Sequence, residues 1–392
     1  MAKEKNTNTG TKSKHVEVET NVERDDLALL LQKALNKSNK DGSKACYFLD
    51  EGDNPAEIKE WVSTGSTLLD LAVSNTPHGG LPVGRVVILN GLQGTGKSLL
   101  CAHLIKNTQD KGGQSVFFDS EAAVDKKYWE SFGVSIKNTA YVPFLTVEEL
   151  FTKIEICIGE FRKANQDKLL TIFVDSVAAA SHEAEVIAEH GAQGFNTQKS
   201  QILGKALRKV TNMIATQRIL IVFTNQLRQI LNSTPFGEKY TSPGGMALPY
   251  HASVIVRLSS LGKLKKDETI IGMKTQASVI KNRCGPNYRS AQFEIHYDSG
   301  IQDLSSWLLY AKEHNIITGT AAKYVWKRET GDELTFNTSK FVELMNDDKT
   351  LKEEFYQLIC KQYIMEYRNP NEKIVENIEE TAEEADAIIP ED

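Results

Sequence analysis

The middle of the chain alternates short, continuously apolar runs with longer segments of helical periodicity. Continuous apolar runs rich in β-branched residues indicate strands that are buried on both faces of a sheet. The strands are predicted at residues 84–90, 115–119, 169–176 and 219–225. The intervening segments include predicted helices at 98–113 and 197–217. Strands separated by helices predict an α/β fold with a mainly parallel, twisted sheet that is covered on both faces.

Three further apolar runs follow the fourth strand at short separations. They lie at residues 252–258, 276–283 and 290–298. Strands so close together in sequence favour hairpins, because a parallel connection needs a longer crossover. We therefore expect these strands to extend the same sheet.

The pattern changes after Gln302. A helix is predicted at 303–317, followed by a small hairpin that turns at Gly331. Two helices come next, and Thr338 can cap the first of them. These elements predict a small C-terminal α+β domain at 303–368.

The N-terminal region has its own pattern. Residues up to Arg24 are polar and are predicted to be disordered. Residues 25–37 have the periodicity of an amphipathic helix with Asp25 or Asp26 as its N-cap. Residues 44–50 resemble a short strand. The expected division of the chain is 1–60 for this region, 61–302 for the core, 303–368 for the small domain and 369–392 for an acidic tail.

The composition narrows the class of protein. Hydrophobic residues make up 40% of the chain and charged residues 25%, as in globular proteins. No apolar run is long enough to span a bilayer, and the N-terminus lacks the apolar core of a signal peptide. The five cysteines are scattered and form no C-x-x-C pair, which argues against zinc. We expect a reducing compartment such as the cytoplasm, and no membrane partner.

The net charge of −6 comes from the end of the chain. From Asn371 onward there are nine acidic residues and one basic residue, Lys373, so this tail carries −8 and the rest of the chain +2. A nearly neutral body leaves nucleic-acid binding open. The tail is either a solvated end or an electrostatic competitor for an anionic ligand of the body.

The segment GLQGTGKS, which begins at Gly91, has the pattern G-x-x-x-x-G-K-[ST] and lies between a predicted strand and a predicted helix. Its glycines let backbone N–H groups surround phosphate oxygens, and the helix N-terminus adds partial positive charge. Lys97 is expected to reach the β- and γ-phosphates of ATP, and Ser98 to bind Mg²⁺. The nucleotide-binding candidates are Gly91, Leu92, Gln93, Gly94, Thr95, Gly96, Lys97, Ser98 and Leu99.

Three polar residues end or follow predicted strands at the edge where α/β sheets bind ligands. Asp175 suits a second Mg²⁺ ligand, although a helix N-cap is the alternative. Glu121 can orient and deprotonate a water, or it can cap a helix or pair with Lys126. Gln226 can sense a γ-phosphate, or its amide can satisfy local backbone groups. A long polar loop follows Gln226, and such loops are usually functional.

The order and spacing of several motifs make the chain similar to the RecA family of ATP-dependent DNA recombinases, and within it to versions encoded by bacteriophages. The resemblance implies the RecA-like P-loop ATPase fold. It also implies the cytoplasm of a bacterial cell as the compartment. The segments that carry it are VSTGSTLLDLAV, GGLPVGRVVILNGLQGTGKS, FFDSEAAVDKKYW, IFVDSVAAASHEAE, ALRKV, IVFTNQLRQI, PGGMALPYHASVIVRL, VIKNR and DSGI, and the small domain and acidic tail follow the family's layout.

The resemblance implies ATP and Mg²⁺ as cofactors and assigns roles at the nucleotide. Glu121 matches the catalytic glutamate of the family. Asp175 and Ser176 match an acid-serine pair near the metal. Gln226 matches the glutamine that couples the γ-phosphate to the second DNA-binding loop.

Other matches imply contacts with adenine and with a neighbouring subunit. Asp125 and Tyr128 match the pair that contacts adenine. Lys281 and Arg283 match two basic residues that reach the ATP of the next subunit, although the family usually has lysine at the second position. Tyr250 matches an aromatic residue at the subunit interface. The helix at 26–36 and the run ACYFL resemble elements that dock onto the adjacent subunit.

The resemblance also implies two DNA-binding loops. The second follows Gln226 and includes Tyr240 among its possible contacts, and the first covers Glu185 to Gly194, where the chain departs from the family pattern. Phosphate contacts hold the strand, and aromatic residues stack on its bases. The DNA-binding candidates are Arg208, Arg228, Phe236, Lys239, Gly244 and Gly245.

The function that these observations predict is an ATPase that forms a helical filament on single-stranded DNA and exchanges strands with a homologous duplex, in recombination and repair. Single-strand-binding and loader proteins are expected partners. Two alternatives stay open: a ring helicase or motor with the same core, and a nucleotide-switched interaction protein that binds no DNA.

Overall fold

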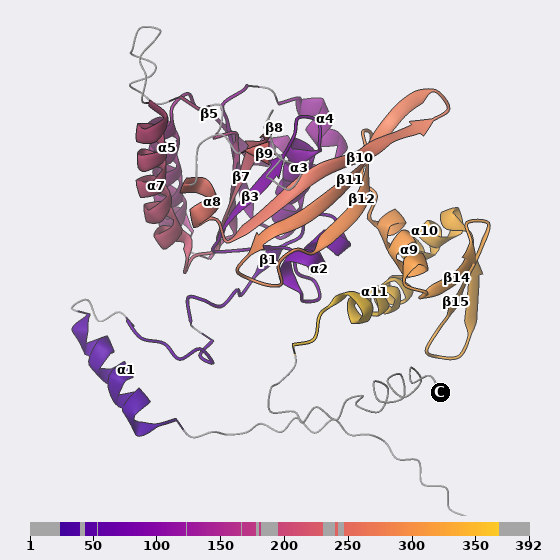
Figure 1. Cartoon of the computed structure of the whole chain (residues 1–392), viewed down its shortest axis with the longest axis horizontal. Coiled ribbons are helices and arrows are strands. Elements are labelled where there is room, and N and C mark those ends of the chain that lie inside the picture. Colours follow the sequence, from indigo (N-terminus) through magenta and orange to yellow (C-terminus); the bar gives the residue numbers. More distant parts are fainter. Residues whose placement is uncertain are drawn as a thin grey trace, which may run out of the picture. The chain divides into compact units, whose positions relative to one another are not determined.

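The computed structural model describes residues 24–39, 44–52, 54–122, 124–165, 167–177, 180–181, 195–229, 240–241 and 247–367. The chain divides into two compact units, Met1–Glu57 and Ile58–Asp392 (Figure 1). Each unit is described by itself. Within the described ranges, no helix is both long enough and apolar enough to cross a membrane.

The first unit contains helix α1 (Asp26–Ser38), and its N-cap is Asp25, whose side chain accepts the Leu27 amide. None of the α1 residues is buried, and four leucines of this helix are at least half exposed. Burial of such an apolar face requires a surface that this unit does not itself supply.

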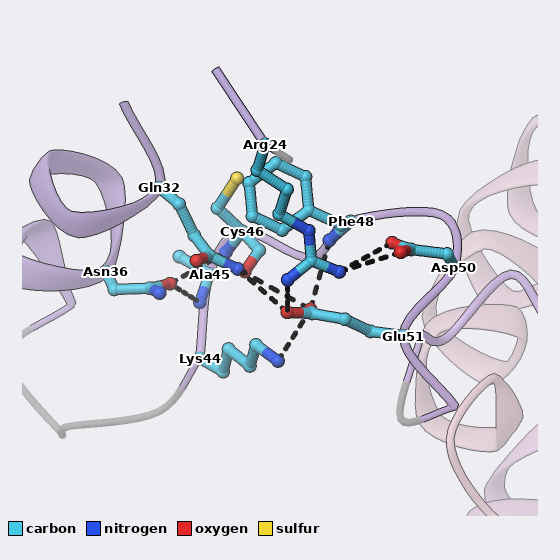
Figure 2. Close-up of polar contacts among 9 residues, drawn as sticks. All are labelled: Arg24, Gln32, Asn36, Lys44, Ala45, Cys46, Phe48, Asp50 and Glu51. Atoms are coloured by element: carbon cyan, nitrogen blue, oxygen red, sulfur yellow. Dashed lines mark hydrogen bonds and ion pairs between the residues drawn. The ribbon is translucent and has the colours of Figure 1, made fainter. Parts of the chain in front are cut away.

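The predicted strand at 44–50 is wrong for the single chain, because its described residues form no ladder. The amides of Ala45 and Cys46 instead donate to Asn36 Oδ1 of α1, both at 2.8 Å. Figure 2 shows Glu51 accepting bonds from Lys44 and from the Phe48 amide, at 2.7 and 3.0 Å. A strand needs a partner to satisfy its backbone groups, and here side chains satisfy them.

The second unit is built on a nine-stranded sheet with the order β13-β12-β11-β10-β3-β7-β6-β4-β5. Strands β10, β3, β7, β6, β4 and β5 pair in parallel, and β10 through β13 pair antiparallel. This arrangement confirms the α/β fold and the hairpin extension. The strands are β3 (Val86–Gly91), β4 (Gln114–Asp119), β5 (Thr139–Pro143), β6 (Leu170–Asp175), β7 (Ile219–Gln226), β10 (Val254–Lys266), β11 (Thr269–Asn282), β12 (Ser290–His296) and β13 (Gly300–Ile301).

Side chains alternate between the two faces of the sheet and so form two cores. Val87 and Leu89 pack in the core that includes residues of α2 (Thr67–Ser74) and α3 (Lys97–Asp110). Val86 and Ile88 pack in the core that includes α5 (Val147–Ala164) and α7 (Phe195–Ile214), which lie side by side in Figure 1. Burial on both faces explains why these strands are apolar without interruption.

Several short elements connect the sheet and its helices. The strand β5 was not predicted, because as an edge strand it has no buried residue and hence no continuous apolar run. The remaining elements are β1 (Trp61–Val62), β2 (Leu81–Pro82), α4 (Lys126–Ser131), a 3₁₀ turn at Ile136–Asn138, β8 (Arg228–Gln229), β9 (Tyr240–Thr241) and α8 (Ala247–His251).

The C-terminal elements confirm a small α+β arrangement whose hairpin turns at Gly331, a residue with φ of 92°. Two details differ from the prediction. Asn337 rather than Thr338 is the N-cap of α10, since its side chain accepts the Lys340 amide at 2.8 Å. A third strand, β14, precedes the hairpin. The elements are α9 (Asp303–Glu313), β14 (Ile317–Thr320), β15 (Lys323–Lys327), β16 (Glu333–Phe336), α10 (Thr338–Asp347) and α11 (Lys349–Tyr363).

Candidate functional site

A cavity of about 500 Å³ opens at the carboxyl ends of the parallel strands. This is the edge of an α/β sheet where ligands bind. Its walls come from the loop after β3, the start of α3, the ends of β6 and β7, the loop after β4, and β11 and β12. The lining residues are Gln93, Gly94, Gly96, Lys97, Ser98, Leu99, Glu121, Tyr128, Asp175, Ser176, Gln226, Met273, Ile295 and Tyr297.

The loop between β3 and α3 has the backbone shape of a phosphate-binding loop. Gly94 and Gly96 have φ of 71° and 92°, values that residues with a Cβ rarely adopt. A Cβ at Gly96 would also lie 2.7 Å from Ile295 Cδ1. Gly96 caps α3 without a side chain, so the first N–H groups of this 14-residue helix point toward the cavity edge.

Lys97 is folded back onto the loop that precedes it. Its Nζ donates to the carbonyl oxygens of Gly91 and Leu92, at 3.0 and 2.8 Å. Burial lowers the pKa of the Lys97 ammonium, while the nearby Asp175, Cys101 and Glu121 oppose that shift. Neutral carbonyls are weaker acceptors than charged oxygens, so an anion in the cavity can compete for this ammonium.

Asp175 links β6 to the phosphate loop and to β7. Its Oδ2 accepts the Ser98 hydroxyl at 3.0 Å, and its Oδ1 accepts the Thr224 hydroxyl at 2.5 Å. Carboxylate and hydroxyl oxygens are the hard ligands that Mg²⁺ prefers. The donor set of Ser98 and Asp175 therefore fits a magnesium ion, and the structure brings both predicted metal ligands together.

Glu121 lies in the cavity wall, on the loop that leaves β4. Its amide donates to Asp119 Oδ1 at 2.8 Å, and Asp119 Oδ2 accepts the Tyr141 hydroxyl at 3.1 Å. The Ser120 amide donates to the carbonyl oxygen of Asp175 at 2.9 Å. These bonds tie the backbone of the Glu121 loop to the ends of β4 and β6.

Gln226 is the last residue of β7, is exposed, and lines the same cavity. The next amide, that of Leu227, donates to the Gly91 carbonyl at 3.1 Å. The backbone then continues into β8, which pairs Arg228 with Thr241 of β9. The end of β7 is thus bonded directly to the phosphate loop and leads directly into the segment predicted to bind DNA.

The two predicted adenine contacts have different positions. Tyr128 lines the cavity, whereas Asp125 is absent from the described lining residues and acts as the N-cap of α4. Its Oδ1 accepts the amides of Lys127 and Tyr128, at 2.9 and 3.3 Å. Asp125 therefore caps α4 in this structure, and a ligand would have to compete with these two amides for its carboxylate.

Sequence reasoning missed three lining residues, Met273, Ile295 and Tyr297. They belong to β11, β12 and the turn after β12, more than 170 positions from the phosphate loop. The run at 290–298 predicted a strand, but only the strand order places that strand beside Gly96.

Lys281 and Arg283 lie at the opposite end of the sheet from the cavity, where the parallel strands begin. Asn282, which lies between them, pairs with Val254, and Val254 pairs with Val87, the second residue of β3, whereas the cavity begins after Gly91. Nζ of Lys281 donates to the carbonyl oxygens of Pro249 and Tyr250, at 2.8 and 3.1 Å. The structure therefore does not bring these cations to the cavity of their own chain.

Other cations and an aromatic ring gather at that end. The pKa of His251 is lowered by burial and by the positive charges of Arg208, Arg283 and Lys281, so these three cations lie around His251. The adjacent Tyr250 side chain is 70% exposed. A cationic group beside an exposed aromatic side chain suits contact with an anionic ligand on another molecule.

The predicted DNA contacts are only partly described. Arg208 is exposed on α7, and the backbone of Arg228 begins β8. Phe236, Lys239, Gly244, Gly245 and the predicted first loop at 185–194 lie outside the described residues.

Comparison with known proteins gives consistent matches over most of the chain. The family model described as the RecA N-terminal domain matches residues 29–302. Protein RecA of Acinetobacter baylyi is 31% identical over 340 residues, which are 87% of this chain and 93% of the relative. Protein RecA of Streptomyces venezuelae is 32% identical, covering 79% and 78%, and Protein RecA of Nitratiruptor sp. is 33% identical, covering 76% and 84%. These matches do not test the expected bacteriophage origin, which stays a prediction.

Proposed function

The chain belongs to the RecA family of DNA recombinases, and we propose that it hydrolyses ATP at a seam between two copies of the chain while they hold single-stranded DNA. The copies form a helical filament that pairs this strand with a homologous duplex. One observation carries the proposal. The cavity with Gln226 lies at the carboxyl ends of the parallel strands, and Lys281 lies at the opposite end of the sheet, where these strands begin. A head-to-tail assembly brings such opposite ends of successive copies together.

Nucleotide binding exchanges the present partners of Lys97 for phosphate oxygens. The two carbonyls that Lys97 now contacts are neutral, and a charged β- or γ-phosphate oxygen is a stronger acceptor. The N-terminus of α3 adds N–H donors because Gly96 leaves it uncovered. Tyr128 and Tyr297 in the cavity wall supply rings that can stack on adenine.

Hydrolysis needs a base and charge stabilisation. Glu121 orients and deprotonates the attacking water, and the bond from its amide to Asp119 holds its backbone in place. Ser98 and Asp175 would hold Mg²⁺, and the ion would neutralise the charge that develops on the phosphates. Lys97 places its ammonium beside the same oxygens, and the carboxylates of Asp175 and Glu121 favour its charged form.

The cations at the other end of the sheet complete the site of the next copy. Burial and the neighbouring Arg283 lower the pKa of Lys281, so Lys281 and Arg283 repel each other in the free chain. A triphosphate presented by another copy relieves that repulsion. ATP therefore strengthens the contact between copies, and by linkage the contact strengthens ATP binding.

Gln226 couples the binding of the γ-phosphate to the position of the DNA-binding segment. It lines the cavity, and the following amide bonds to Gly91 of the phosphate loop. A shift of Gln226 toward the γ-phosphate thus moves the start of the segment that leads through Arg228. The proposed DNA contacts are Arg208, Arg228, Phe236, Lys239, Gly244 and Gly245.

The proposal is tested by ATP turnover of the full chain with and without single-stranded DNA, together with electron microscopy in a non-hydrolysable ATP analogue. We expect DNA to stimulate turnover, filaments to form, and DNA affinity to fall as salt rises. Turnover that DNA leaves unchanged would favour an interaction protein. Closed rings without filaments would favour the helicase alternative.

A further inference from the structure

Thr224 is a polar residue at a buried position of β7. Leu220 and Val222, which point to the same face of this strand, pack in the apolar core that includes α3. Thr224 follows the same alternation and has no exposed surface. A hydroxyl buried among apolar groups costs free energy unless it is hydrogen-bonded. Its partner therefore explains why threonine stands there.

The partner is Asp175. Thr224 Oγ1 lies 2.5 Å from Asp175 Oδ1, while the next acceptor, the Val174 carbonyl, lies at 3.4 Å. A hydroxyl has one proton to donate, and the shorter contact has the geometry of a bond to a charged acceptor. The Thr224 proton is thus committed to the carboxylate.

The two oxygens of this carboxylate have different tasks. Oδ1 is held by Thr224, and Oδ2 faces the Ser98 hydroxyl at 3.0 Å. With Oδ1 fixed on the β7 side, the carboxylate cannot rotate freely, and Oδ2 stays directed at the phosphate loop. We propose that Thr224 is a positioning residue of the nucleotide site, which holds Asp175 so that Oδ2 meets the divalent cation bound with ATP. This rests on the proposed function, because it needs Ser98 and Asp175 as metal ligands.

Thr224 acts through Asp175 and does not touch the nucleotide. Among the described residues, it is absent from the cavity wall. Partners that orient a metal ligand typically change metal affinity by about 10- to 100-fold when they are removed. Loss of the hydroxyl should therefore weaken nucleotide binding in the presence of the cation and leave metal-free binding unchanged.

The experiment measures the Kd of a fluorescent, non-hydrolysable ATP analogue with the full chain, once in Mg²⁺ and once in EDTA. Thr224→Val keeps the shape of the side chain and removes the hydroxyl. We expect it to weaken binding about tenfold in Mg²⁺ only. Thr224→Ser, which keeps the hydroxyl, should restore the wild-type value in Mg²⁺.

Thr171→Val is the matched control. Thr171 is also fully buried in the same sheet, and its hydroxyl lies 2.9 Å from that of Thr108. This substitution removes a buried threonine hydroxyl that has no contact with Asp175, so both Kd values should stay at wild type. Thermal unfolding confirms that each variant is folded, and Thr224→Ala replaces Thr224→Val if valine prevents folding.

Three results would overturn the proposal, and they are distinguishable. Equal weakening in Mg²⁺ and in EDTA would make Thr224 a packing residue of the nucleotide pocket. Unchanged binding in both conditions would remove any role in the site. A wild-type chain whose affinity is the same in Mg²⁺ and EDTA would instead reject Ser98 and Asp175 as metal ligands, and the role of Thr224 with them.

Discussion

Asp303 caps helix α2 from 236 positions further along the chain. Its Oδ1 accepts the Thr67 amide at 2.7 Å, and its Oδ2 accepts the Thr67 hydroxyl at 2.6 Å. Ser66, the N-cap residue of α2, makes no side-chain capping bond of its own. The first residue of α9 therefore stabilises α2 and joins the C-terminal elements to the core.

This contact predicts that Asp303→Ala destabilises the fold, because it leaves the Thr67 amide and hydroxyl without their acceptor. The expected loss is about 1–2 kcal/mol, as for other helix caps. Urea unfolding measures it. Asp348→Ala is the matched control, since Asp348 caps α11 through the nearby amides of Thr350 and Leu351.

Both cap variants should lose stability, but only Asp303→Ala should also increase hydrogen exchange in α2. An unchanged urea midpoint for Asp303→Ala would show that the bonds to Thr67 contribute nothing.

The role proposed for Glu121 predicts that Glu121→Gln abolishes catalysis without abolishing binding. An amide cannot take the proton of the attacking water, so turnover should fall by at least about 100-fold. The affinity for ATP and for single-stranded DNA should be retained. Lys97→Ala, in contrast, should lose ATP binding itself.

Glu130→Gln is the control, because Glu130 is an exposed residue of α4 that does not belong to the described cavity wall. It should turn over ATP normally. Normal turnover by Glu121→Gln would overturn the assignment of the base.

Lys281 lies at the end of the sheet away from the cavity of its own chain. We therefore expect two inactive chains to complement each other. One chain carries Lys97→Ala, and the other carries Lys281→Ala with Arg283→Ala. In a mixed filament, a seam is complete where the second chain supplies the pocket and the first supplies the cations. Random head-to-tail mixing should restore about a quarter of wild-type ATP turnover.

The readout is turnover at saturating single-stranded DNA as a function of the mixing ratio. Activity should be greatest for equal amounts of the two chains. If the mixture is no more active than either chain alone, the cations do not act on the ATP of a neighbouring copy.

His103 predicts a pH-dependent component of stability. It lies on α3, and its Nε2 accepts the Ile301 amide at 3.0 Å. Burial, with a smaller effect of Lys106, lowers its pKa from 6.5 to about 4. The unfolded chain therefore binds the proton more readily than the folded chain. This contribution is complete above pH 6.5 and is lost as the pH falls from 6.5 toward 4.

The expected loss by pH 4 is up to about 2 kcal/mol, since His103 retains some exposure to solvent. His103→Gln keeps an acceptor near the Nε2 position and removes the titration. Urea unfolding from pH 7 to pH 4 should show a smaller loss for this variant than for the wild type. His78→Gln, which changes a histidine whose side chain is 67% exposed, is the control. Parallel curves for His103→Gln and wild type would contradict the prediction.

Much of the proposed nucleotide site was predictable from local sequence. The glycines at 91, 94 and 96 and the lysine at 97 lie within one short loop and the first residue of α3. Their spacing alone therefore predicts phosphate binding. Asp175 and Gln226 end apolar strands, and strands of one parallel sheet end at the same edge. Local patterns also predicted α1, α3, α7 and the antiparallel extension of the sheet.

The remaining features depend on contacts between distant segments. Tyr297 enters the cavity only because β12 pairs with β11 and β11 with β10, which lies beside β3. The strand predicted at 44–50 does not form, because a strand is completed by a neighbour and not by its own residues. From the sequence alone, Thr224 is an ordinary strand residue and Asp303 an ordinary first residue of a helix. Only the structure shows their partners.

Short-range patterns thus specify which residues can bind phosphate, because that chemistry lies within one loop and one helix turn. Strand order and packing specify which carboxylate oxygen faces that loop, which rings line the cavity and which end of the sheet carries the cations. Those relationships join residues separated by tens to hundreds of positions. Hydrogen bonds and burial create them only when the strands assemble into the sheet.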